Sequence, residues 1–409
     1  MLGIHDAPAQ PAHKAQPTAK KSPASSTPTS YDKKPAGTAA DASTYAEQLY
    51  RQAMAQAGIN TDSTSSPLPT GDRTTAPPVA DSPATDTTSA GPGLAATTTS
   101  PATAAVPATP EVRVYDSAAA GADGRAAYVG SATTLDSSSA TSDARTAADN
   151  VARGLDYFAK TFGRNGIDQA GSGVDVVLND HSVGTDGAEL FHGNGGYYTT
   201  KDSTGTLSEA IRWGDGISYN HKNGGKVDQL SMLNAEDLTI HEMTHGVIKH
   251  ETGAIGGTAD ESGSVNEAFA DVIAASATRD WKLGESMYAA DSDYKYMRNL
   301  ADPNDPKAIH TLWTTKGQYD QAVASGTVEE HYASGIISTA AARMQQSIGG
   351  EAGFQAVEQL FYHTITDHRM GDMSFAQVAQ GLRTTASTMW GSNDARSQAL
   401  NTQLQAAGL

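Results

Sequence analysis

The chain of 409 residues contains no cysteine. Disulfides and thiolate metal ligands are therefore excluded, so any metal site must be built from histidine and carboxylate side chains. No apolar run is long enough for a transmembrane helix, and we expect no membrane insertion. The N-terminal stretch MLGIHDAPAQPAHKAQ lacks the apolar core of a Sec signal peptide, so export would use another route.

Phe and Trp are absent from residues 1–110, which nevertheless hold 15 of the 17 prolines. With its long runs of Ala, Ser and Thr, this region cannot bury enough apolar surface to offset chain entropy, which predicts disorder. The stretch DASTYAEQLYRQAMAQAG (41–58) is an exception that predicts a short helix. Two interpretations stay open: a linker with a transient helix, or a pro-segment or secretion element that folds against another surface.

Residues 111–409 carry 21 basic against 38 acidic side chains. This acidic balance argues against nucleic acid or an anionic membrane as a partner. It suits a soluble, secreted, calcium-tolerant protein, which we expect to be a monomer.

The order of predicted elements indicates an α+β fold. Strands are predicted at 112–117, 174–180 and 197–200, a turn-rich piece at 213–220, and a helix over 142–163 that ends at Gly163. A second helix is predicted over 231–253 with Asn234 as its N-cap, and helical patterns follow nearly to the C-terminus. We therefore predict an α/β lobe over 111–233 and, over 234–409, a metal-binding helix with an all-helical lobe.

The second helix contains the sequence LTIHEMTHGVIKH. His241 and His245 lie one turn apart on one face, so both imidazoles can reach one ion. Glu242 projects about 100° away, where it can contact a water on that ion instead of the ion itself. Because a chance H-E-x-x-H has a probability of roughly two in a hundred in such a chain, the motif alone does not establish a zinc site.

A catalytic zinc takes three protein ligands and keeps a fourth position for water. A third histidine on the same segment is excluded, because Glu251 stands where H-E-x-x-H-x-x-G-x-x-H requires it. ESGSVNEAFAD (261–271) offers Glu267 as the third ligand and, one turn later, Asp271 as acceptor for the free ring N–H of His241. The alternative is that both carboxylates lie on a solvent-exposed helix face. The apolar residues around them favour a buried helix instead, in which each carboxylate needs a polar or charged partner.

HEMTH followed by ESGSVNEAFAD resembles the thermolysin family of zinc metalloendopeptidases, the gluzincins, over nearly all of 111–409. FGRNGID (162–168) resembles its protealysin-like branch. The resemblance implies a two-lobed α+β fold with the zinc helix between the lobes. MRNLADP resembles the family's arginine segment, which implies that Arg298 grips a substrate carbonyl. HYASGI resembles H-x-N-S-G-I, which implies that His331 is an active-site histidine and not a ligand.

Several positions depart from the family pattern. A family tyrosine that helps to bind the oxyanion falls near Thr258, and the aspartate five residues before the active-site histidine is Gly326. Glu329 or Glu330 could orient that histidine instead. The family's N-A-F-W edge strand appears as NGGYY, which leaves Asn194 as the candidate for a contact with the substrate amide.

The family's calcium ligands are matched only in part. Asp237, Asp280 and Glu285 fall at carboxylate positions, but Thr278 and Lys282 replace two others. Because a lysine repels Ca²⁺, we expect a reduced site or none.

The implied activity is hydrolysis of protein and peptide bonds. Glu242 would take the proton from a zinc-bound water, and His331 would stabilise the oxyanion. Leu238, Leu283 and Met297 resemble the family's main specificity pocket, which predicts cleavage before bulky apolar residues. Two rivals remain: an aminopeptidase, although no G-A-M-E-N-type segment appears, and a catalytically dead relative kept as a binding protein, although Glu242 is intact.

Overall fold

The computed structural model describes residues 110–118, 126–135, 141–181, 193–201, 207–221, 224–254 and 257–409. These ranges all belong to one compact unit, Thr38–Leu409. The other unit, Met1–Gly37, lies outside the described residues. So do the helix predicted over 41–58 and all but the last residue of the region 1–110 predicted to be disordered. Within the described ranges, no helix has the length and apolar character needed to cross a membrane.

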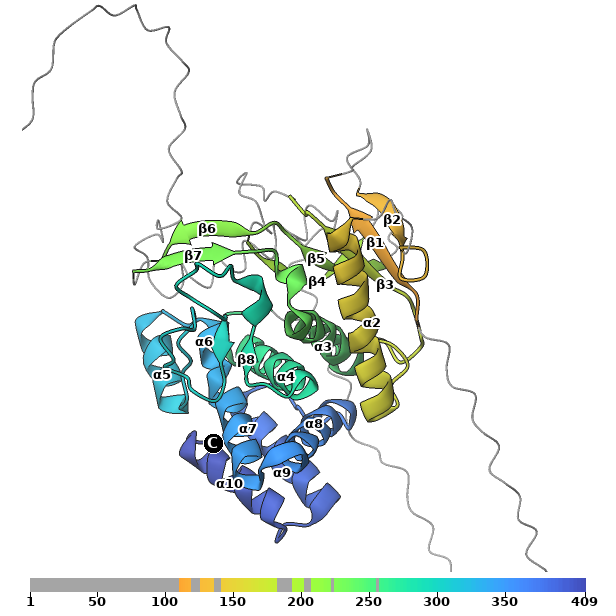
Figure 1. The fold of residues 1–409 in the computed structure, drawn as a ribbon. Coiled ribbons are helices and arrows are strands. Elements are labelled where there is room, and N and C mark those ends of the chain that lie inside the picture. Colours follow the sequence, from red (N-terminus) through yellow and green to blue (C-terminus); the bar gives the residue numbers. More distant parts are fainter. Residues whose placement is uncertain are drawn as a thin grey trace, which may run out of the picture. The chain divides into compact units, whose positions relative to one another are not determined.

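A five-stranded mixed sheet forms the first part of the fold (Figure 1). The central strands β1 (Val112–Asp116), β3 (Val174–Leu178) and β5 (Leu207–Trp213) run parallel, and β2 (Ala127–Ser131) and β4 (Gly195–Lys201) pair antiparallel at the two edges. The predicted strands at 112–117, 174–180 and 197–200 are confirmed as β1, β3 and part of β4.

The segment predicted to be turn-rich contains strands as well. Trp213 ends β5, and β6 (Ile217–Asn220) pairs antiparallel with β7 (Lys226–Gln229) in a separate hairpin. The prediction was wrong for 217–220, because it counted these residues as a continuation of the Gly-Asp-Gly turn, whereas they form a strand.

Helix α2 (Ser142–Phe162) confirms the prediction over 142–163. The Thr141 side chain accepts a hydrogen bond from the Ala144 amide, as an N-cap does. Gly163 ends the helix with φ of 68°, a left-handed conformation that glycine adopts without a Cβ penalty. Its apolar face packs against β1, β3 and the next helix.

The helix predicted over 231–253 is divided in two. A 3₁₀ turn, η1 (Met232–Asn234), precedes α3 (Glu236–Thr252), whose N-cap is Ala235. The prediction of Asn234 as N-cap was therefore wrong. Its side-chain amide donates to the Ser231 carbonyl, 2.9 Å away, and does not cap α3. The buried Met232 and Leu233 continue the apolar pattern and concealed the break.

The remaining chain is largely helical, as predicted, and completes an α+β fold with a mixed-sheet lobe and a helical lobe. Helix α4 (Glu261–Thr278) is buried on every side along most of its length and packs against α3, α6, α7 and α8. A helix that is buried on every side lies in the centre of a domain. The other elements are β8 (Lys282–Leu283), η2 (Glu285–Met287), β9 (Arg298–Asn299), α5 (Lys316–Ser325), α6 (Glu330–Ala333), α7 (Gly335–Ile348), α8 (Gly350–Thr366), α9 (Phe375–Trp390) and α10 (Ala395–Ala406).

Candidate metal centre

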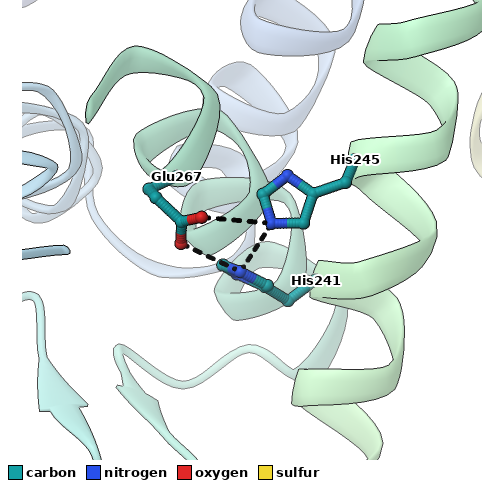
Figure 2. Close-up of side chains that lie close together, drawn as sticks. All are labelled: His241, His245 and Glu267. Atoms are coloured by element: carbon teal, nitrogen blue, oxygen red, sulfur yellow. Dashed lines mark hydrogen bonds and ion pairs between the residues drawn. The ribbon is translucent and has the colours of Figure 1, made fainter. Parts of the chain in front are cut away.

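Three side chains from α3 and α4 converge on one point (Figure 2). The Nε2 atoms of His241 and His245 lie 3.0 Å apart. From α4, Glu267 places Oε2 3.2 Å from His241 Nε2 and Oε1 3.4 Å from His245 Nε2. The sequence placed all three on helices, and the packing of α3 against α4 brings them together.

These distances match the geometry of a tetrahedral metal. Ligand atoms bound at about 2.0–2.1 Å in a tetrahedral zinc site lie roughly 3.3 Å from one another. The side chains of His241 and Glu267 are only 5% and 7% exposed, and within the described part of the chain Glu267 Oε2 is buried without a hydrogen bond. A buried carboxylate oxygen of this kind needs a cation, so the three residues fit a metal.

Second partners fix the orientation of both imidazoles. Asp271 Oδ1 lies 3.0 Å from His241 Nδ1, as the sequence predicted. Asn266 Oδ1 lies 2.6 Å from His245 Nδ1 and acts as acceptor when that nitrogen carries the proton, which leaves Nε2 as the ligand atom. Asn266 was missed by the sequence analysis, although its position directly before Glu267 was a signal.

Asp271 also connects α4 to two later segments. It is fully buried, and Oδ1 accepts a hydrogen bond from Arg298 Nη2 at 2.8 Å while Oδ2 accepts one from Ser334 Oγ at 3.3 Å. Burial would raise the pKa of this carboxyl, but Arg298 and His241 hold the pKa below its ordinary value. Asp271 is therefore a carboxylate, and Arg298, 1% exposed, is its buried counter-charge.

The ligand cluster has the electrostatic character of a cation site. Burial disfavours the charged imidazolium, yet Asp271 and Glu267 raise the pKa of His241 to about 10. Burial likewise opposes ionisation of Glu267, but His331, His245 and His241 keep its pKa well below the usual range. The same field that retains a proton attracts a divalent ion, and metal binding displaces the proton.

Glu242 is held by the edge strand of the sheet. Its Oε2 accepts a hydrogen bond of 2.9 Å from the Tyr197 amide in β4. The close approach of β4 to α3 depends on Gly246, because a Cβ there would meet the Tyr197 ring at 2.8 Å and Ile167 at 2.6 Å. Tyr197 and Gly246 were not singled out from the sequence.

His331, in α6, lies beside the ligand Glu267. Its Nε2 is 3.5 Å from Glu267 Oε2, and its Nδ1 is 2.7 Å from Glu329 Oε1. Burial lowers its pKa, but Glu267 and Glu329 outweigh that effect and raise the pKa to about 9. The other oxygen of Glu329 accepts from the Tyr332 amide at 2.7 Å. The sequence left open whether Glu329 or Glu330 orients His331. In the structure, Glu329 contacts the imidazole ring.

Arg298 and Asn194 differ in how the structure places them. Within the described residues, Arg298 Nε and Nη1 are buried without a hydrogen-bond acceptor, beside the ion pair with Asp271. Asn194 is exposed and directly precedes β4, where its carbonyl accepts from the Gly214 amide at 3.0 Å. Among the described residues, no hydrogen bond or ion pair joins the Asn194 side chain to His241, His245 or Glu267. At the place of the missing family tyrosine, Thr258 donates to Asp260 Oδ1 at 2.8 Å.

The candidate calcium ligands are engaged in other contacts. Both oxygens of Asp237 accept backbone amides, from Leu238 at 2.8 Å and Gly284 at 2.7 Å. Glu285 lies 3.8 Å from Lys282 Nζ. In the described residues, the close groups of metal-ligating side chains are the His241 cluster and Glu329–His331, and Asp237, Asp280 and Glu285 do not form one.

Comparison with known proteins is consistent with this site. Residues 258–409 match the family described as "Thermolysin metallopeptidase, alpha-helical domain". This match includes Glu267, Asp271, Arg298 and His331, and it begins just after α3.

Curated relatives match a longer part of the chain. Neutral protease B of Bacillus subtilis is 24% identical over 262 residues, which are 62% of this chain and 43% of that protein. Bacillolysin of Bacillus amyloliquefaciens is 28% identical over 265 residues, 63% of this chain and 43% of that protein. The extracellular elastase of Staphylococcus epidermidis is 25% identical over 240 residues, 58% and 41% of the two chains. The chain thus spans less than half the length of these relatives.

The fold is similar to a solved structure of the precursor of protealysin, a metalloproteinase from Serratia proteamaculans. The TM-score is 0.56 with 19% sequence identity, and the match covers 73% of this chain and 87% of that chain. The family match assigns residues 258–409 to the helical domain of the thermolysin metallopeptidases, and the curated relatives and the shared fold agree with the resemblance found in the sequence.

Proposed function

We propose that the protein is a zinc metalloendopeptidase that hydrolyses peptide bonds of proteins and peptides. The observation that carries this proposal is the spacing of 3.0, 3.2 and 3.4 Å among the ligand atoms of His241, His245 and Glu267. A zinc ion held there would polarise a peptide carbonyl and lower the pKa of a bound water to about 7.

Glu242 is the proposed general base. It lies on the same helix as the two histidines but outside the group of ligand atoms. The Tyr197 amide fixes Oε2, so Oε1 takes the proton from the attacking water and returns it to the leaving amine. Proton transfer by a fixed carboxylate contributes about 10²–10⁴ in rate.

His331 and Arg298 are proposed to bind the reacting peptide. Glu267 and Glu329 raise the pKa of His331, which favours a protonated ring that can donate a hydrogen bond from Nε2 to the developing oxyanion. Arg298 directs two N–H groups that lack acceptors in the described part of the chain, and they suit a substrate carbonyl. Asn194 remains a prediction for a contact with the substrate amide.

The apolar pocket predicted from sequence is supported by proximity. Leu238 and Met297 both lie within 3.4 Å of the position that a Cβ on Gly284 would occupy. Leu283 pairs with Arg298 in the β8–β9 ladder, so these apolar side chains adjoin the arginine. These contacts support cleavage before bulky apolar residues, and a peptide library cut chiefly before charged residues would contradict this specificity.

Secretion is proposed as well, because one relative is described as an extracellular elastase. We also propose that 111–233 and 234–409 are the two lobes around the zinc helix, and that 1–110 is a pro-segment or secretion region. N-terminal sequencing of the active secreted form tests the last point: a start near Val112 supports removal, and an intact region excludes obligatory cleavage.

Casein hydrolysis by the full chain tests the proposed activity. Cleavage should stop with a zinc chelator, return with added zinc, and be lost in Glu242→Gln while that variant still binds one zinc. Glu236→Gln is the matched control, because Glu236 is on the same helix but pairs with Arg153 at the surface, the two side chains being 40% and 52% exposed. A wild-type protein that binds zinc and never cuts, or a Glu242→Gln protein that still cuts, would exclude the proposal.

A further inference from the structure

Glu209 in β5 joins the edge strand of the sheet to the last turn of α3. Its carboxylate accepts hydrogen bonds from the Tyr197 hydroxyl in β4 and from Lys249 Nζ, and its Oε2 lies 2.7 Å from His250 Nε2. Both β4 and β5 pack against α3 (Figure 1). The side chains of Glu209, Lys249 and His250 are 25%, 20% and 30% exposed. The ion pair with Lys249 is therefore partly shielded from water, which makes it stronger than a pair on an open surface.

The register of the sheet places Glu209 beside Tyr197. In the β4–β5 ladder, Tyr197 pairs with Ile211 and Glu209 pairs with Thr199. Glu209 and Tyr197 are therefore diagonal neighbours on one face of the sheet. This face turns toward α3, because the Tyr197 ring lies against Gly246. Strand pairing and the position of the helix together produce the contact.

Tyr197 is anchored at two points. Its backbone amide donates to Glu242 Oε2 at 2.9 Å, and its hydroxyl donates to Glu209. Burial and Glu209 raise the pKa of the Tyr197 hydroxyl. Burial also opposes ionisation of Glu209, but Lys249 and Tyr197 hold its pKa below the ordinary value. The bond thus joins a neutral phenol to an ionised carboxylate, which is stronger than a bond between two neutral groups.

Strand β4 depends on such contacts for its distance from the helix. Among the described residues its only neighbour in the sheet is β5, so strand pairing holds it on one side alone. A tyrosine side chain has a rigid ring and two rotatable bonds, so fixing the hydroxyl restricts the backbone of the same residue. Lys249 and His250 lie in the last turn of α3, about two turns after Glu242. The Glu209 contacts therefore hold β4 on α3 at a second place along the helix.

We infer that Glu209 is a positioning residue for the proposed general base, because it holds the Tyr197 hydroxyl against the end of α3 and thereby keeps the Tyr197 amide on Glu242. Glu209 lies outside the group of ligand atoms and acts through Tyr197. This inference rests on the proposed function and adds to it a residue that positions the base from a neighbouring strand.

Steady-state kinetics of the zinc-loaded full chain on a peptide substrate test this role. Glu209→Ala and Tyr197→Phe should each lower kcat about tenfold, with KM and zinc affinity little changed, because neither change removes a ligand or a substrate contact. The double variant should be no slower than the slower single variant, since both changes remove the same contact. Glu209→Gln keeps an acceptor oxygen for the hydroxyl and should recover part of the rate.

Hydrogen exchange of the Tyr197 amide measures the positioning without any cleavage. In zinc-loaded protein with isotope-labelled tyrosine, NMR should show that Glu209→Ala speeds this exchange about tenfold. Tyr157→Phe is the matched control, because the Tyr157 hydroxyl also donates to a glutamate, Glu358 at 3.0 Å, but joins α2 to α8. The control should lose stability and keep both kcat and the Tyr197 exchange rate.

Several results would overturn the inference. A Glu209→Ala protein with the wild-type kcat or an unchanged Tyr197 exchange rate would do so. An equal loss of kcat in Tyr157→Phe, or additive losses in the double variant, would assign Glu209 to general stability instead. If Glu209→Ala does not fold, Tyr197→Phe decides the question with labelled phenylalanine, because it removes one hydroxyl group only. A wild-type protein that fails to cut casein would refute the proposed activity, and amide exchange would still show whether Glu209 holds β4 on the helix.

Discussion

Replacing Asp271 with asparagine should damage both the stability and the metal affinity of this protein. The change keeps the shape of the side chain and removes its charge. Arg298 would then be an unpaired charge in a site where it is 1% exposed, and His241 would lose the carboxylate 3.0 Å from its Nδ1.

The two effects differ in size. Leaving one partner of a fully buried ion pair alone costs about 3–5 kcal/mol of unfolding free energy. Removing the carboxylate that orients a metal-bound imidazole typically weakens metal affinity by about 10–100-fold. A solvent-exposed ion pair contributes only about 0–1 kcal/mol to the free energy of unfolding. The large expected loss of stability therefore depends on the burial of Asp271 and Arg298.

Urea unfolding in the presence of a chelator measures the first effect, and competition with a chromophoric zinc chelator measures the second. Asp175→Asn is the control, because Asp175 pairs with Arg113 at 2.6 Å with the two side chains 18% and 34% exposed. The control should lose little stability and keep its zinc affinity.

A double-mutant cycle identifies the cause. If the unpaired arginine is responsible, Asp271→Asn combined with Arg298→Met should be less destabilised than the sum of the single changes. Strict additivity, or an Asp271→Asn variant as stable as Asp175→Asn, would refute the reasoning from burial.

Three further predictions concern contacts around the site. Gly246→Ala should lower stability by about 1–3 kcal/mol in thermal unfolding and reduce casein cleavage, because the new methyl group pushes Tyr197 and β4 away from the helix; an unchanged kcat would contradict this. Asn266→Leu should weaken zinc affinity by about tenfold in chelator competition, and equal affinity would show that the 2.6 Å contact does not fix the imidazole. Glu329→Gln should lower kcat about tenfold through loss of one charge-assisted hydrogen bond, with KM little changed and Glu329→Asp partly restoring it; Glu330→Gln should have a much smaller effect, and equal losses would exclude Glu329 as the positioning residue.

The sequence by itself determined the features that depend on neighbours within one or two helical turns. The four-residue spacing of His241 and His245, and of Glu267 and Asp271, fixes each pair on one helix face whatever the rest of the chain does. The apolar composition of α4 likewise predicted its burial, and the order of strands and helices predicted the α+β fold.

Only the tertiary structure decided contacts between segments far apart in the chain. The Tyr197 amide reaches Glu242 across 45 residues, and nothing in either segment specifies that approach except a glycine in α3. The choice of Glu329 over Glu330 depends on the direction in which a short helix presents its first residues. The turn signal before Ile217 and the apolar residues before α3 both led to wrong predictions. The local sequence pattern does not distinguish a strand from a turn, or a 3₁₀ turn from an α-helix, and tertiary packing selects between them.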